Sequence, residues 1–139
     1  MRLSTKGRYG LHTMFELARH YGDDPIPLSE ISKATDLPMG YLEQLVRKLK
    51  KDNLVDSIRG PKGGYFLTRD PKEITVGDVL RSAEDFFGVT ECSNSDGVCC
   101  KEDYCVARQV WQVIADEINN TIDSITLQDM VDRNVKKTR

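Results

Sequence analysis

Four cysteines lie close together in this 139-residue chain and are its residues best suited to chemistry. They follow the spacing C-x6-C-C-x4-C, as Cys92, Cys99, Cys100 and Cys105. Zinc and iron–sulfur clusters both bind convergent thiolates, so both kinds of site remain open. The paired C-x2-C hairpins of many zinc sites are absent, and adjacent Cys99 and Cys100 would be awkward ligands of one tetrahedral ion. The spacing therefore predicts a metal site and disfavours zinc.

Residues 84–103, which include Cys92, Cys99 and Cys100, lack helical periodicity. A loop of about twenty residues inside a compact domain is usually functional or disordered. Polar and acidic neighbours argue against four unrelated buried thiols, because such side chains are mostly exposed. Those neighbours are Asp96, Lys101, Glu102 and Asp103. We therefore interpret the segment as an exposed metal-binding loop.

The cellular compartment bears on how the cysteines are used. No apolar run approaches the roughly 20 residues of a membrane span, and the start MRLSTKGRYG lacks the apolar core of a signal peptide. We therefore expect a cytoplasmic protein with no membrane partner. In that compartment, clustered cysteines more often bind metal or perform redox chemistry than form disulfides.

A second group of candidate residues lies within positions 39–64. Apolar residues spaced i, i+3, i+4 and i+7 predict an amphipathic helix there. They are Leu42, Leu45, Val46 and Leu49. The opposite face is polar and mostly basic, with Glu43, Gln44, Arg47, Lys48, Lys50 and Lys51. Asn53 is a candidate left-handed residue just after the helix. On its own this pattern also suits an ordinary solvated helix face.

The segment after this helix favours nucleic-acid recognition. Leu54–Ile58 and Tyr65–Thr68 are β-prone and are separated by a turn rich in glycine. The tip of the resulting ribbon carries Arg59 and Lys62. Glycines let such a loop approach a phosphate backbone closely and place an arginine in a minor groove. A basic helix followed by a basic wing predicts a winged helix-turn-helix.

Further helices must position this pair of elements. Tyr9–Tyr21 reads as a buried scaffold helix, and Leu28, Ile31 and Ala34 mark a short helix before the turn at 36–38. Thr75–Ala83 reads as a capped helix.

The C-terminal part of the chain predicts a long helix from about Tyr104 and a short last helix opened by Thr126 and Asp129. The apolar side of the long helix is Val106, Val110, Val113, Ile114, Ile118 and Ile122. A seam of that length favours a dimer interface over a core helix alone.

The expected fold is mainly α with a small β-wing. We divide it into a DNA-binding domain at 1–83, the cysteine loop at 84–103, and a dimerisation helix with its tail at 104–139. The net charge is −2, yet residues 1–70 hold 12 Lys+Arg against 9 Asp+Glu. The positive charge thus lies in the half with the helix and wing.

The sequence does not indicate an enzyme, because it has no nucleophile–base pair and no phosphate-binding glycine motif.

Five motifs in fixed order resemble the IscR branch of the Rrf-two family of bacterial winged-helix regulators. They are MRLSTKGRYGL, YLEQLVRKLKK, RGPKGGYFL, ITVGDVL and ITLQDMV. The resemblance implies a homodimer joined through the long helix, and a three-cysteine loop that holds a [2Fe-2S] or, in other branches of the family, a [4Fe-4S] cluster; we predict [2Fe-2S]. It also implies that Glu43 and Gln44 face base edges and that Arg59 enters the minor groove.

Our candidate site residues combine the pattern and the resemblance. For DNA they are Tyr41, Glu43, Gln44, Arg47, Arg59 and Lys62. For the cluster they are Cys92, Cys100 and Cys105, with Cys99 as an alternative or fourth ligand. Arg108 stands where the IscR pattern has a histidine ligand, and a guanidinium has no lone pair for a metal. Asp96, Glu102 or a residue of the other subunit are further candidates for the fourth ligand.

These residues predict a transcription regulator that senses iron–sulfur status, controls cluster-assembly genes and acts as a repressor on an approximately palindromic duplex. Sensing of nitric oxide or redox state by the same cluster is a close alternative. An electron-transfer protein is the alternative from another class. The basic helix and wing favour DNA, because a redox partner needs no minor-groove arginine.

Overall fold

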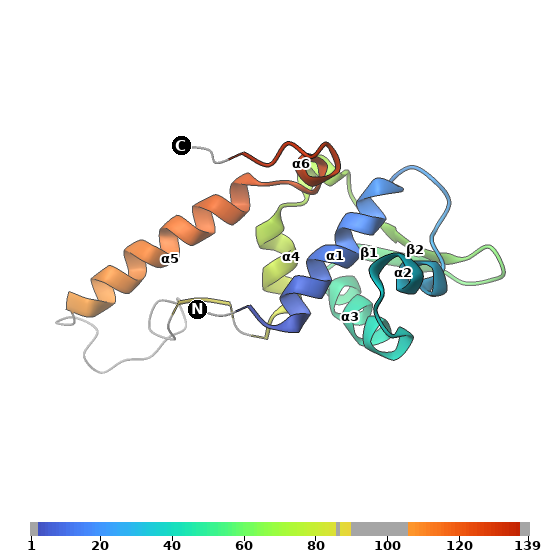
Figure 1. Ribbon diagram of the computed structural model, residues 1–139, viewed down its shortest axis with the longest axis horizontal. Helices are drawn as coiled ribbons and strands as arrows, with labels where there is room; N and C mark the ends of the chain where they lie inside the picture. Colours follow the sequence, from blue (N-terminus) through green and yellow to red (C-terminus); the bar gives the residue numbers. More distant parts are fainter. Residues whose placement is uncertain (1–2, 86, 90–105, 137–139) are drawn as a thin grey trace.

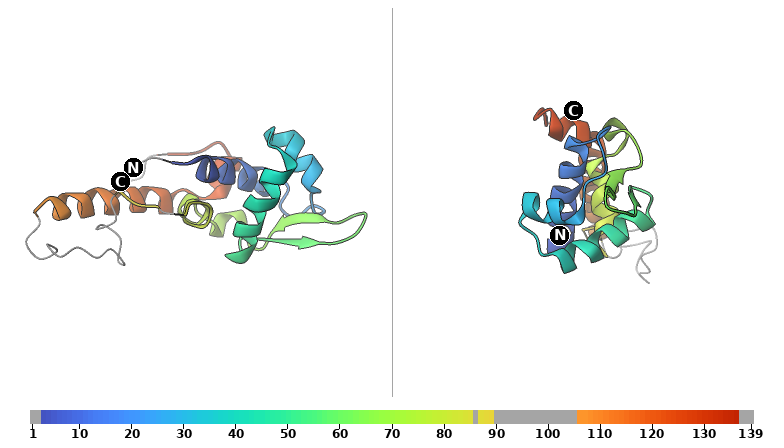
Figure 2. Two further views of the ribbon diagram at one scale, coloured as in Figure 1. Left: turned by 90° about the horizontal axis from the view of Figure 1, so that it is seen from below. Right: turned by 90° about the vertical axis from the view of Figure 1, so that its right-hand side faces the viewer.

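A computed structural model describes residues 3–85, 87–89 and 106–136 of the chain. Its helical domain carries a two-stranded ribbon, and one long helix extends from it, so that the ribbon and this helix lie at opposite ends (Figures 1 and 2). The four cysteines lie outside the described residues.

The helix-turn-helix consists of α2, Leu28–Thr35, and α3, Met39–Lys51, packed against α1, Thr5–Arg19. Asp36 ends α2 in the left-handed region at φ 58°, and Asn53 does the same after α3 at φ 60°. The short turn and the stop at Asn53 are therefore confirmed.

The first helix begins earlier than the sequence pattern suggests. We expected it at Tyr9–Tyr21, whereas α1 spans Thr5–Arg19. Ser4 is its N-cap and accepts a hydrogen bond from the Lys6 amide. The expectation was wrong because the polar start of α1 has no apolar period, and its stabilising partner, Glu84, lies far along the chain.

The wing pairs β1, Val55–Ile58, with β2, Gly64–Leu67, in an antiparallel ribbon. The predicted strands are therefore confirmed to within a residue at each end. A bridge between Ile26 and Tyr65 joins the ribbon to the loop before α2. This contact fixes the start of β2, directly after the turn of the wing, to the loop that leads into the helix-turn-helix.

Of the C-terminal helices, α5 extends from the domain and α6 packs on its core. The short 3-10 helix η1, Pro71–Glu73, precedes α4, Val76–Ala83, and later come α5, Val106–Ser124, and α6, Leu127–Val131. Thr75 and Thr126 each form a capping box, as their sequence contexts predict.

A shared core lies under the helix-turn-helix, the wing, α4 and α6. Its largest fully buried apolar side chains are Met14, Leu17, Ile31, Leu42, Leu49, Ile74 and Leu127. The predicted apolar face of α3 is buried as a whole. The core therefore fixes which face of α3 remains outside.

Candidate nucleic-acid interface and its link to the cysteine segment

The outer face of α3 exposes the residues predicted to read bases. Glu43, Gln44 and Arg47 are all exposed, while the apolar residues between them are buried. Pro38 precedes the helix without a side-chain hydrogen bond to its first turn. A helix that projects polar side chains from a fixed core has the form needed to enter a major groove.

The wing tip presents both predicted basic residues. Arg59 and Lys62 are exposed, and Gly60 adopts φ 118°, a left-handed conformation that a side chain would strain. Ile58 beside them is 54% exposed. An apolar side chain next to an exposed arginine suits the walls of a narrow groove.

Tyr41 differs from the other predicted contacts because it is half-buried. Its ring packs edge-on against Tyr9 at a centroid distance of 5.7 Å, and its hydroxyl donates to Thr5 Oγ1 at 3.5 Å. The residue therefore joins the start of α3 to the start of α1. Its side chain is therefore only partly available to a ligand.

The basic residues at the end of α3 meet different partners. Lys50 donates to Ser57 Oγ at 2.9 Å and lies 3.7 Å from Asp56, so it links α3 to the wing. Lys48 forms an ion pair with Asp85 and reaches the Ala83 carbonyl at 3.5 Å. The sequence pattern placed Lys48 with the DNA-facing residues; the fold instead directs it toward α4.

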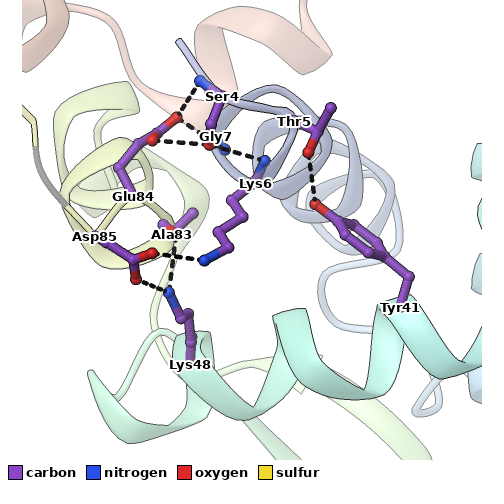
Figure 3. Close-up of polar contacts among 9 residues, drawn as sticks. All are labelled: Ser4, Thr5, Lys6, Gly7, Tyr41, Lys48, Ala83, Glu84 and Asp85. Atoms are coloured by element: carbon purple, nitrogen blue, oxygen red, sulfur yellow. Dashed lines mark hydrogen bonds and ion pairs between the residues drawn. The ribbon is translucent and has the colours of Figure 1, made fainter.

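Glu84 and Asp85, just after α4, connect to both α1 and α3 (Figure 3). The Glu84 carboxylate accepts from the Ser4 amide and hydroxyl, each at 2.8 Å, and from the Gly7 amide at 3.1 Å. A Cβ at position 7 would overlap this carboxylate. Glycine at position 7 therefore allows the Glu84 carboxylate to come close to the backbone of α1.

Asp85 lies between two lysines. Its carboxylate accepts from Lys48 and, at 2.6 Å, from Lys6. These hydrogen bonds, first from Lys48 and then from Lys6, lower the pKa of Asp85 to about 2, and the Asp85 carboxylate raises the pKa of Lys6. Sequence reasoning missed Lys6 and Asp85, since no local pattern connects residues so far apart.

The predicted metal ligands cannot be placed, because all four cysteines, with Asp96 and Glu102, lie outside the described residues. Among the residues that are described, no group of three histidine, cysteine or acidic side chains could hold a metal. The donor set that remains is four thiols, whose chemistry fits an iron–sulfur cluster. Arg108 lies near the start of α5 and carries no metal-binding lone pair.

The model of the Rrf2 family, described as an iron-dependent transcriptional regulator, matches residues 3–133. The HTH-type transcriptional regulator IscR of Sodalis glossinidius is 40% identical over 131 residues, covering 94% of this chain and 79% of its own. IscR of Photorhabdus laumondii is 38% identical over the same shares.

Two solved structures share the fold and 38% of aligned residues. T. potens IscR matches with a TM-score of 0.77, over 96% of this chain and 88% of its own. CymR, the global cysteine regulator of B. subtilis, matches with a TM-score of 0.81, over 96% of this chain and 98% of its own.

Within the described residues, no helix has the length and apolar character to cross a membrane.

Proposed function

This chain belongs to the Rrf2 family of iron-dependent transcriptional regulators, and on that premise we propose how it binds DNA and iron. It is a DNA-binding transcription regulator and not an enzyme, as the sequence predicts. Its proposed role is to sense iron–sulfur status and to control genes for cluster assembly. The IscR relatives, similar over most of the chain, support this role.

The observation that carries the DNA-binding mode is the continuity of α3 with the wing. Glu43, Gln44 and Arg47 would face base edges in the major groove, because they are exposed on a helix fixed by its buried face. Arg59 would enter the adjacent minor groove, and Lys62 would contact a phosphate. The edge of Tyr41 would contact the backbone beside them.

Dimerisation is proposed through α5. This helix buries only Ala115 among its described residues and leaves large apolar side chains outside. They include Val106 at 71% and Val113 at 62% exposure, with Val110, Trp111 and Ile114. A second copy of α5 would cover them, and two α3 helices related by two-fold symmetry would read an approximately palindromic duplex.

The cofactor proposed is a [2Fe-2S] cluster held by Cys92, Cys100 and Cys105. The family's dependence on iron and the clustered thiols support it. Cys99, a nearby carboxylate or a residue of the partner subunit would complete the ligand set, since Arg108 cannot. Such a cluster supplies a centre whose state depends on iron and oxidants; the residues of this chain do the DNA recognition.

Purification without oxygen tests the cofactor. We expect coloured protein containing iron and sulfide, and we expect Cys92→Ala, Cys100→Ala and Cys105→Ala each to lose most of the iron. Cys99→Ala, the matched control, should lose less. Iron and sulfide analysis with absorption spectra decides the question. Zinc alone, or full iron in all three variants, would show that the proposed cofactor is wrong.

A further inference from the structure

Asp85 is a negative charge placed beside the proposed DNA-binding face. Its side chain is 69% exposed, and Lys6 and Lys48 hold it from α1 and α3. The N-terminus of α1, the C-terminus of α4 and α3 meet on the lower side of the molecule in Figure 1. The three side chains converge there, with Asp85 between the two ammonium groups (Figure 3).

A small hollow beside these lysines connects them to the recognition helix. Its volume is about 80 Å³, and it is lined by Lys6, Tyr41, Gln44, Leu45 and Lys48. Tyr41 and Gln44 are two of the residues proposed to bind DNA. A duplex that reached Gln44 would therefore bring its sugar–phosphate backbone close to both lysines.

The two lysines suit a phosphate as well as they suit a carboxylate. Lysine binds phosphate as a point charge, so it accepts an anionic oxygen of either group. Exposed ion pairs contribute little net stability, and Lys6 is 43% and Lys48 37% exposed. Exchange of the Asp85 carboxylate for a phosphate oxygen would therefore cost little.

We propose that Lys6 and Lys48 form a seat for one phosphate of the DNA backbone, which Asp85 occupies in the free protein and leaves when DNA binds. Asp85 then acts as an internal competitor of DNA. The proposal rests on the proposed DNA-binding mode and adds two lysines and a competing carboxylate to it.

Equilibrium binding across a salt series tests the seat. The probe is the duplex that the wild-type protein selects from a random library, labelled for fluorescence anisotropy. Asp85→Asn should bind roughly two- to tenfold more tightly at 0.1 M salt, because both lysines become free. Lys48→Met and Lys6→Met should each weaken binding and reduce the slope of log K against log[salt] by about 1. Asp85→Asn added to Lys48→Met should recover little.

Asp52→Asn is the matched control, since it removes the same charge from an exposed residue at the end of α3. Equal tightening by Asp52→Asn would show an effect of net charge alone and would overturn the seat. Unchanged or weaker binding by Asp85→Asn, or unchanged salt slopes in both lysine variants, would overturn it too. If the wild-type protein selected no duplex, the DNA-binding mode itself would fail, which is a different result.

Discussion

Arg47 and Lys48 are neighbours in the sequence but have different surroundings. Arg47 is exposed on the outer face of α3, whereas Lys48 turns to Asp85 and the Ala83 carbonyl. Lys50, two residues on, links the helix to the wing through Ser57. The basic residues of α3 therefore differ in their partners: Arg47 stays exposed, Lys48 pairs with Asp85 and Lys50 contacts the wing. Each role depends on the partner that the fold supplies.

Arg59 and Glu43 should differ in the kind of specificity they provide. Arg59→Ala should weaken binding to every duplex, because it removes a charge from the minor groove. Glu43→Ala should mainly alter base preference, with a specific base contact worth roughly 1 to 3 kcal/mol. Competition binding with base-substituted duplexes measures both effects, with Lys72→Ala as a basic control outside the interface. Equal binding of Arg59→Ala and wild type at every salt concentration would contradict the minor-groove role.

The helices α4 and α6 start in the same way, and the residues at their starts are joined. Each follows an Ile-Thr pair and closes a capping box, Thr75 with Asp78 and Thr126 with Asp129. The two starts also bond to each other: the Val76 amide donates to the Ile125 carbonyl at 2.8 Å, and the Leu127 amide to Ile74 at 2.9 Å. These two backbone hydrogen bonds hold the chain against the core again after α5.

The C-terminal end of α5 is also attached to α4 through side-chain hydrogen bonds. Arg81 donates to both carboxylate oxygens of Asp123, at 2.8 and 2.9 Å, and to the Asn119 side chain at 2.9 Å. A Cβ at position 77 would overlap Asp123. The hydrogen bonds of Arg81, together with the two capping boxes, thus set the direction in which α5 extends from the domain.

Loss of a cap should lower stability without affecting DNA contacts. Thr75→Ala removes the hydroxyl that accepts from the Asp78 amide at 3.1 Å and should cost about 1 kcal/mol in the free energy of unfolding. Thr126→Ala should cost a similar amount. Urea denaturation followed by circular dichroism measures it, with exposed Thr121→Ala as the control. A loss in the control as large as in Thr75→Ala would rule out the capping explanation.

On the scale of the whole molecule, α5 extends away from the domain, with the wing at the opposite end (Figure 2). The described part of the chain leaves several of its apolar side chains exposed, although the rest of the domain has a closed core. They are Val106, Val110, Trp111, Val113 and Ile114. Exposed apolar patches of this kind mark interaction surfaces. A dimer through α5 would leave both wings free for DNA.

A charge on the apolar side of α5 should separate the dimer. We expect Val113→Lys to run as a monomer in sedimentation equilibrium and to bind a palindromic duplex more weakly, because its half-sites are no longer linked. Gln112→Lys, on the polar side of the same helix beside Asp116, should remain dimeric. A dimeric Val113→Lys, or a monomeric wild type, would show that α5 is not the interface.

Several elements could be predicted because their signals are local in the sequence. The apolar spacing of α3, the glycine turn of the wing and the two Thr–Asp caps each depend on residues within about two helical turns. Side-chain pattern and backbone preference act over that range. For this reason the winged helix-turn-helix and the exposed positions of Glu43, Gln44 and Arg59 could be predicted.

Contacts between residues far apart in the sequence depend on how the helices pack. The true start of α1 depends on Glu84, 80 positions from Ser4, and the direction of Lys48 depends on Asp85, 37 positions away. Neither pairing has a periodic or compositional signal, because it arises only when α4 packs against α1 and α3 in one core. The link between the recognition helix and the segment leading to the cysteines is therefore a property of the packed fold.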